Sequence, residues 1–224
     1  MTGSIPVTAA ALAGVPAGVQ AQGVWAGRRQ LFVRFAGEAE TATMYTSTAL
    51  VREIERQLGR STFHSITIGG RDPLGNVPFL LLALGAAKPS VPVMLDTDGQ
   101  RPSAIAEVVA HVAMVQVTLD FTGPDAMITH AMQSLSAAAS AQCAHALVIC
   151  PKDDTTDAQV LRVIEQAHAA APAIQVIVHP PVTSGEAPTL DRRWSTLLEQ
   201  AVALHADCRI AMRVPPPKIG RAHV

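Results

Sequence analysis

The chain has 224 residues, of which 49% are hydrophobic, so it is long enough for one sizeable core and does not require a second domain. Its formal net charge is −1 and its basic residues are scattered, which argues against the concentrated positive surface of a nucleic-acid-binding protein. No apolar run approaches the roughly 18 residues of a membrane helix, so we expect a cytoplasmic protein whose partner is a small molecule or another protein.

Residues 1–18 are apolar and rich in alanine, but they do not have the features of a signal peptide. They lack a basic start, and Pro6 and Pro16 interrupt them. We expect residues 1–18 to be an N-terminal extension with no requirement for ordered structure. Residues 19–224 are expected to form the single domain.

Seven short apolar runs alternate with stretches of helical periodicity. This alternation predicts parallel strands joined by crossover helices. Several runs are apolar throughout, as is typical of strands buried on both faces, so we predict an α/β fold of the partial (β/α) barrel type. The predicted strands are residues 31–36, 64–68, 91–95, 114–119, 144–150, 174–178 and 208–212.

Three of the intervening stretches carry clear helix signals. Leucine and isoleucine fall on one face of residues 47–58, and a second apolar stripe runs over residues 190–201. Between them, Thr156 and Gln159 have the spacing of a capping box, which predicts that a helix begins there.

Charged residues follow several of the predicted strands. In parallel α/β folds the functional site lies at the carboxyl ends of the strands, so these side chains are expected to converge there. Such a group is suited to acid–base chemistry or to a divalent metal. The alternative is that each carboxylate caps the next helix or stays solvated. We therefore predict no metal site, and name Asp72, Asp96 and Asp120 as its ligands if one exists. The residues concerned are Glu38, Glu40, Asp72, Asp96, Asp98, Asp120 and His179.

The cysteines, Cys143, Cys150 and Cys208, are odd in number and widely spaced. This pattern argues against a disulfide framework and against a clustered metal site. Buried, reduced thiols are the expected state.

Six short motifs occur in chain order at predicted turns and strand ends. They are VQAQG with GRRQLFVRFAG at 19–37, SITIGGRDPL at 65–74, LDTDG at 95–99, VTLD at 117–120, HPPVT at 179–183 and VPPPKIG at 214–220. Over nearly the whole chain, they resemble the 7-carboxy-7-deazaguanine synthase branch of the radical S-adenosylmethionine superfamily. The resemblance implies a partial barrel, a homodimer and a pterin-like ligand.

The sequence departs from that family where the radical chemistry would occur. The family holds a four-iron cluster with three cysteines, and the corresponding positions here are Glu38, Ala42 and Tyr45. None of them can provide a thiolate. Arg71 also replaces a glycine in the turn that approaches the cofactor. We therefore expect neither an iron–sulfur cluster nor bound S-adenosylmethionine.

Several residues at the family's ligand-contacting positions are retained. The resemblance implies that Arg34 holds a ligand carboxylate, although an ion pair with a nearby acid is the alternative. It also implies that the turn containing Gln20 and Gln22 contacts the ligand, with Gln22 in place of a carboxylate. The full set of candidate ligand-binding residues is Gln20, Gln22, Arg34, Gly70, Asp72, Asp96, Asp98, Asp120 and His179.

Three hypotheses remain open at this point. The first is a catalytically inactive relative that acts as a binding or partner subunit for a pterin-like or purine-like ligand. The second is an enzyme with cluster-independent chemistry at the acidic strand ends. The third is a structural or regulatory dimer, with itself or with another protein. A fold alone does not choose among them.

Overall fold

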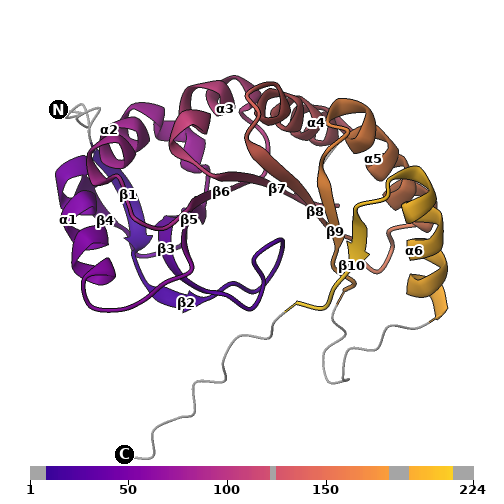
Figure 1. Cartoon of the computed structure of the whole chain (residues 1–224), viewed down its shortest axis with the longest axis horizontal. Coiled ribbons are helices and arrows are strands. Elements are labelled where there is room, and N and C mark those ends of the chain that lie inside the picture. Colours follow the sequence, from indigo (N-terminus) through magenta and orange to yellow (C-terminus); the bar gives the residue numbers. More distant parts are fainter. Residues whose placement is uncertain (1–8, 122–124, 182–191, 214–224) are drawn as a thin grey trace, which may run out of the picture.

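The apolar runs form the parallel part of one curved sheet in the computed structural model, which describes residues 9–121, 125–181 and 192–213 (Figure 1). The described residues contain ten strands. These are β1 (Ala9–Gly14), β2 (Ala17–Val19), β3 (Arg29–Phe35), β4 (Thr43–Thr46), β5 (Ser65–Gly70), β6 (Val93–Thr97), β7 (Met114–Asp120), β8 (Ala144–Cys150), β9 (Gln175–Val178) and β10 (Cys208–Ile210).

The sheet has the order β10-β9-β8-β7-β6-β5-β3-β1-β4, with β2 also paired to β3. Strands β3, β5, β6, β7, β8, β9 and β10 pair in parallel, and β1 and β2 pair antiparallel with β3. The sheet does not close on itself (Figure 1). The predicted α/β fold, a partial barrel of parallel strands with crossover helices, is confirmed, and each of the seven predicted strands is present.

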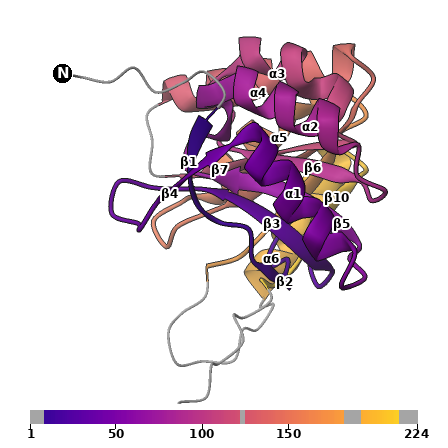
Figure 2. The ribbon, with the colours of Figure 1, turned by 90° about the vertical axis from the view of Figure 1, so that its left-hand side faces the viewer.

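Helices cover the outer face of the sheet. They are α1 (Ser47–Leu58), α2 (Val77–Ala87), α3 (Pro102–Val108), α4 (Asp125–Ser140), α5 (Asp157–Ala170) and α6 (Arg192–Leu204), with short 3-10 turns η1 (Pro73–Asn76) and η2 (Val109–His111). Figure 2 shows α2, α3 and α4 on the outer side of the sheet, seen from the edge that β1 and β4 form. None of the helices in the described ranges combines the length and the apolar character needed to cross a membrane.

The helix signals in the sequence correspond to real helix starts and buried faces. Helix α1 has the predicted bounds and buries Leu50 and Ile54. At the start of α5, Thr156 and Gln159 form the predicted capping box, each side chain bonding to the other's backbone. The apolar stripe of α6 is buried from Trp194 onward, and residues 190–191 lie outside the described part of the chain.

Alternating side chains give the sheet two different faces. The outer face and the helices share the main core, whereas the inner face carries a smaller apolar cluster. This inner cluster consists of Met94, Met114, Ala146, Val148, Cys150 and Ile177, with Val24, Trp25 and Ala211 packed against it.

The N-terminal boundary predicted from the sequence is wrong from Ala9 onward. Strand β1 lies between β3 and β4, and Leu12 is 0% exposed. The run from Ala9 to Gly14 is mostly alanine and has no β-branched residue, so it carries little strand signal of its own. Its neighbours on both sides determine its conformation. Residues 1–8 lie outside the described ranges.

Replacing Leu12 by alanine tests whether this segment belongs to the domain. Leu12→Ala is expected to lower the free energy of unfolding by about 2–5 kcal/mol, because it leaves a cavity in the core. Val19→Ala is the control, since Val19 is 50% exposed and its truncation should change stability by no more than about 0.5 kcal/mol. Urea unfolding gives the stability of both variants. Equal unfolding midpoints would show that residues 9–14 are an extension and do not belong to the folded domain.

Candidate functional site

The register of the parallel strands brings a group of polar residues onto the inner face, above the apolar cluster. Asp96 on β6 is paired with Gln116 on β7, and Asp120 is paired with Cys150 on β8. His179 follows directly after β9. We call the group the inner-face site, and its members are Asp96, Gln116, Thr118, Asp120, Cys150 and His179.

Asp96 is the acid of this site whose pKa is shifted. The Thr118 hydroxyl donates a hydrogen bond to Asp96 Oδ1 over 2.8 Å. Burial raises the pKa of Asp96 above its ordinary value, while hydrogen bonding from the Thr118 hydroxyl and from the Gln116 amide acts in the opposite direction. The carboxyl therefore keeps its proton to a higher pH than an exposed aspartate does, which suits it to donate or accept a proton.

The Gln116 side chain is fully buried, and of its two polar atoms only the oxygen makes a well-formed hydrogen bond. Its Oε1 accepts a hydrogen bond from the backbone N–H of Val24 over 3.1 Å. Its Nε2 is buried and faces the Asp96 carboxyl, whose charged form it favours, but it makes no well-formed hydrogen bond with any described residue. Because Val24 fixes the orientation of the amide, the unpaired group is a donor. Buried donors in folded proteins nearly always have a partner, so this one is an exception to be explained.

His179 has both ring nitrogens occupied. Its Nδ1 lies 2.6 Å from the carbonyl oxygen of Ala211, and its Nε2 lies 2.9 Å from the backbone nitrogen of Gly23. A carbonyl only accepts and an N–H only donates, so Nδ1 carries the proton and Nε2 accepts. Burial lowers the pKa of His179, and Arg213 and Arg209 lower it further, against the effect of Ala211.

Cys150 is unsuited to act as a nucleophile here. Burial raises the pKa of its thiol, against the effect of Arg213, so it stays protonated at neutral pH. Beside it, Asp120 Oδ1 lies 3.6 Å from Nζ of Lys152 in an exposed ion pair. In the described structure Cys143, Cys150 and Cys208 are free thiols; Cys150 is buried as predicted, whereas Cys143 and Cys208 are half-buried.

Residues 20–28, which we call the strap, connect β2 to β3 and reach across the open interior of the sheet (Figure 1). At their base, the backbone N–H of Gln20 donates to the carbonyl of Arg28 over 2.9 Å. Farther along, Val24 and Trp25 pack against the inner cluster. The strap thus covers the face that an unclosed barrel leaves open.

Gly23 allows the strap to lie directly on Gln116. Its φ is +81°, and a Cβ atom built there would lie 1.9 Å from Gln116 Oε1. No larger residue fits without displacing either the strap or the amide. Of the glutamines predicted to contact a ligand, Gln20 is buried at the base of the strap and Gln22 is half-buried on it.

The expected convergence of all strand-end carboxylates is wrong. Asp72 is 2.6 Å and 2.5 Å from the guanidinium of Arg101, in a bidentate pair. Asp98 is exposed and accepts from the backbone N–H of Gln100 over 3.0 Å. Asp72 is therefore held in an ion pair with a residue distant in the sequence, and Asp98 in a turn. Within the described ranges no three His, Cys, Asp or Glu side chains come close enough to hold a metal ion, so Asp72, Asp96 and Asp120 are not assembled as ligands.

Arg34 is half-exposed and forms an ion pair. Its guanidinium lies 2.7 Å from Glu40 Oε1, and Glu40 also accepts from the backbone N–H of Gly37 over 2.9 Å. The ion-pair alternative is therefore present, and a role toward a ligand carboxylate stays a prediction. Gly70 has a positive φ of 97°, and a Cβ there would lie 2.3 Å from the carbonyl oxygen of Phe35, so backbone packing explains this glycine.

The residues at the three cluster positions do not form a thiolate set. Glu38 and Ala42 are exposed in the segment between β3 and β4, and Tyr45 lies on β4 against the core. A carboxylate, a methyl group and a phenol are not donors for an iron–sulfur cluster. Cys150 and Cys208 lie on β8 and β10 instead.

No protein-family model matches the chain, and no curated protein is similar to it in sequence. A solved structure with a similar arrangement of strands and helices is a truncated form of 3-deoxy-D-arabino-heptulosonate 7-phosphate synthase from Thermotoga maritima. It has 12% sequence identity and a TM-score of 0.38, over 84% of this chain and 82% of that chain. Similarity this low carries no information about substrate or reaction.

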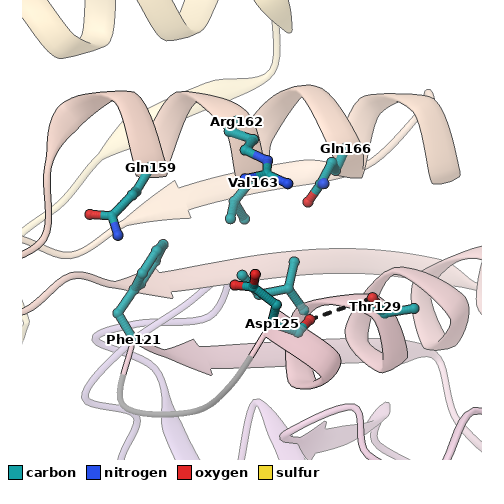
Figure 3. Close-up of a pocket in the computed structure, with 8 residues that line it drawn as sticks. Phe121, Asp125, Thr129, Gln159, Arg162, Val163 and Gln166 are labelled. Carbon is teal, nitrogen blue, oxygen red and sulfur yellow. Dashed lines mark hydrogen bonds between the residues drawn. The ribbon is translucent and has the colours of Figure 1, made fainter.

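A cavity of about 220 Å³ lies on the opposite side of the sheet, between α4 and α5 (Figure 3). Asp125 and Ile128 line it from α4, and Arg162 and Val163 line it from α5. None of the candidate ligand-binding residues lines it, and it is separate from the inner-face site.

Gln116, a member of the inner-face site, and Gly23, which lies against it, were not predicted from the sequence as site residues. A signal for Gln116 was present, because it is a polar residue inside the apolar run of β7, and such residues need a specific reason to be buried. Gly23 lies in a predicted turn, where glycine is common, so its close approach to Gln116 left no distinct mark.

The raised pKa of Asp96 predicts a particular dependence of stability on pH. The folded protein binds this proton more tightly than the unfolded chain, whose aspartate has the ordinary value of 3.8. The contribution of Asp96 to the free energy of unfolding therefore falls as pH rises from that value through the raised pKa, and is constant above it.

Asp96→Asn should remove this pH dependence while keeping an acceptor for Thr118. Urea unfolding between pH 4 and pH 8 is expected to show the variant gaining stability relative to wild type as pH rises. Glu107→Gln on the exposed face of α3 makes the same change in charge and serves as the control. A stability difference that does not vary with pH for Asp96→Asn would show that the carboxyl is not perturbed.

Proposed function

We propose that this protein is a cluster-less relative of the radical S-adenosylmethionine fold that binds a small polar heterocycle at the inner-face site. The observation that carries the proposal is the buried donor of Gln116, which makes no well-formed hydrogen bond, beside the carboxyl of Asp96, whose pKa burial raises. Leaving such a donor unsatisfied costs about 1–3 kcal/mol, and a ligand acceptor would remove that cost.

The chemistry of this pair indicates the class of ligand. The Gln116 amide offers an N–H donor with a fixed direction, and the neighbouring Asp96 carboxylate offers an acceptor. A ring with a carbonyl or ring nitrogen next to an N–H presents the complementary acceptor and donor along one edge. Pterin-like and purine-like heterocycles have such edges, in agreement with the ligand class that the sequence resemblance implies.

The absence of radical chemistry is part of the proposal, and it rests on Glu38, Ala42 and Tyr45. Anaerobic reconstitution with iron and sulfide is expected to give no visible charge-transfer absorption and no bound iron. About four irons per chain would contradict this expectation, since that is the content of one cluster. A Glu38→Cys, Ala42→Cys, Tyr45→Cys variant is the matched positive arm, because it restores the thiolates at the family's spacing.

Ligand binding is tested with a thermal-shift screen of pterins, purines and deazapurines. For a compound that stabilises the wild type, Asp96→Asn is expected to weaken binding by about 5-fold to 150-fold, which corresponds to the loss of one buried hydrogen bond at about 1–3 kcal/mol. Glu107→Gln should bind the same compound as wild type does. Equal affinity in wild type and Asp96→Asn, or no stabilisation by any compound, contradicts the proposal.

A second candidate function is proton-transfer catalysis at the same site, without a cluster. The raised pKa of Asp96 favours it, because a general acid or base works best when its pKa lies near the working pH. Turnover of a bound heterocycle that is lost in Asp96→Asn while binding persists would distinguish an enzyme from a binding protein. Pairing with a second copy or with another protein stays a prediction.

A further inference from the structure

The far side of the strap is attached to the sheet at few points. Among the described residues, its backbone N–H groups make two hydrogen bonds to inner-face side chains: Gly23 to His179 over 2.9 Å and Val24 to Gln116 over 3.1 Å. Arg209 adds a longer contact of 3.5 Å to the carbonyl of Val24. The first of these bonds is buried, and its acceptor is the one group among these that changes charge near physiological pH.

The protonation state of His179 decides whether that bond can form. Because Nδ1–H donates to Ala211, the Nε2 lone pair is free to accept from Gly23. A second proton on Nε2 would place an N–H donor against the N–H of Gly23. The bond would be replaced by repulsion, with a buried positive charge at the same point.

The strap covers the functional groups of the inner-face site. Gly23 lies in contact with the Gln116 amide, and the backbone N–H of Val24 donates a hydrogen bond to Gln116 Oε1. When the strap leaves, the amide is uncovered and the edge of the site next to Asp96 becomes accessible. We infer that the strap is a gate over the inner-face site, held closed by neutral His179 and released when its imidazole is protonated.

The surroundings of His179 favour release rather than retention of a proton. The charged groups of the described residues that act on it are Arg209 on β10 and Arg213 after β10, and both repel an imidazolium. Cys150, at the end of β8 on the other side, is a neutral thiol. Asp120 lies one strand farther on, beyond Cys150, and is paired with Lys152. No carboxylate of the described residues contributes to the pKa of His179, so its protonation is accommodated by movement of the strap.

Trp25 on the strap provides a direct readout, since the chain contains two tryptophans and Trp194→Phe leaves Trp25 alone. Accessibility to acrylamide, measured as a bimolecular quenching constant from fluorescence lifetimes, reports opening. In the open strap His179 loses part of its burial, so its pKa should be higher than in the closed strap. The ratio of open to closed strap is then expected to rise by up to about tenfold per pH unit as pH falls from the pKa of the open state to that of the closed state.

Three variants separate the gate from a general effect of acid. His179→Gln keeps an acceptor in the place of Nε2 but does not titrate, so Trp25 should stay protected at low pH. Gly23→Ala should expose Trp25 already at pH 7.5, because its Cβ collides with Gln116. Gly27→Ala is the matched control, since Gly27 has a similar φ of +80° and no atom within 4 Å of the added Cβ.

The ring of His64 lies 5.2 Å from that of Trp25, and a proton on it would quench Trp25 fluorescence without any opening of the strap. His64→Gln is therefore measured in parallel, and the accessibility of Trp25 in this variant should respond to pH as in the wild type. The gate is tested on the protein without any ligand, so a ligand screen that fails would contradict the proposed function but not the gate. It is overturned if His179→Gln follows the wild-type pH curve, or if wild-type Trp25 stays protected until circular dichroism shows global unfolding.

Discussion

An unclosed parallel barrel leaves the inner face of its strands uncovered, and the rest of this structure depends on how the chain covers it. Helices bury the outer face, but the inner cluster would be exposed without the strap. Val24 and Trp25 supply the apolar contacts, and backbone N–H groups of the strap meet Gln116 and His179. Covering the inner face by a single segment, rather than by further strands, makes both a sheltered polar site and a movable cover possible.

Much of the fold could be predicted from the sequence because its signals are local. The apolar runs of β3 and β5 to β10 can be recognised from their own residues, and the capping box of α5 is a contact between near neighbours in the chain. Strand β1 could not be predicted in the same way, because an alanine-rich run becomes a strand only through pairing with β3 and β4. Pairing between distant segments leaves no periodic mark in a short strand.

The candidate site was predictable only in part, for a related reason. The rule that sites lie at the carboxyl ends of parallel strands selected Asp96, Asp120 and His179, which lie together on the inner face of the sheet. It could not show that Asp72 forms an ion pair with Arg101, or that His179 accepts a hydrogen bond from the strap instead of facing solvent. Which acids remain available depends on turns and pairings between elements far apart in the sequence. Gln116 shows the converse, since its importance follows from one unmatched donor that appears only in three dimensions.

The central claim is that the Gln116 amide and Asp96 together receive a ligand. The most direct measurement is the side-chain amide resonance of Gln116 in ¹⁵N-labelled protein, assigned by its loss in Gln116→Met, during titration with the heterocycle that most stabilises the fold. The account predicts that this resonance shifts and saturates at one equivalent, because Nε2 gains an acceptor. A Gln116 resonance that stays unchanged while the heterocycle binds would contradict the account.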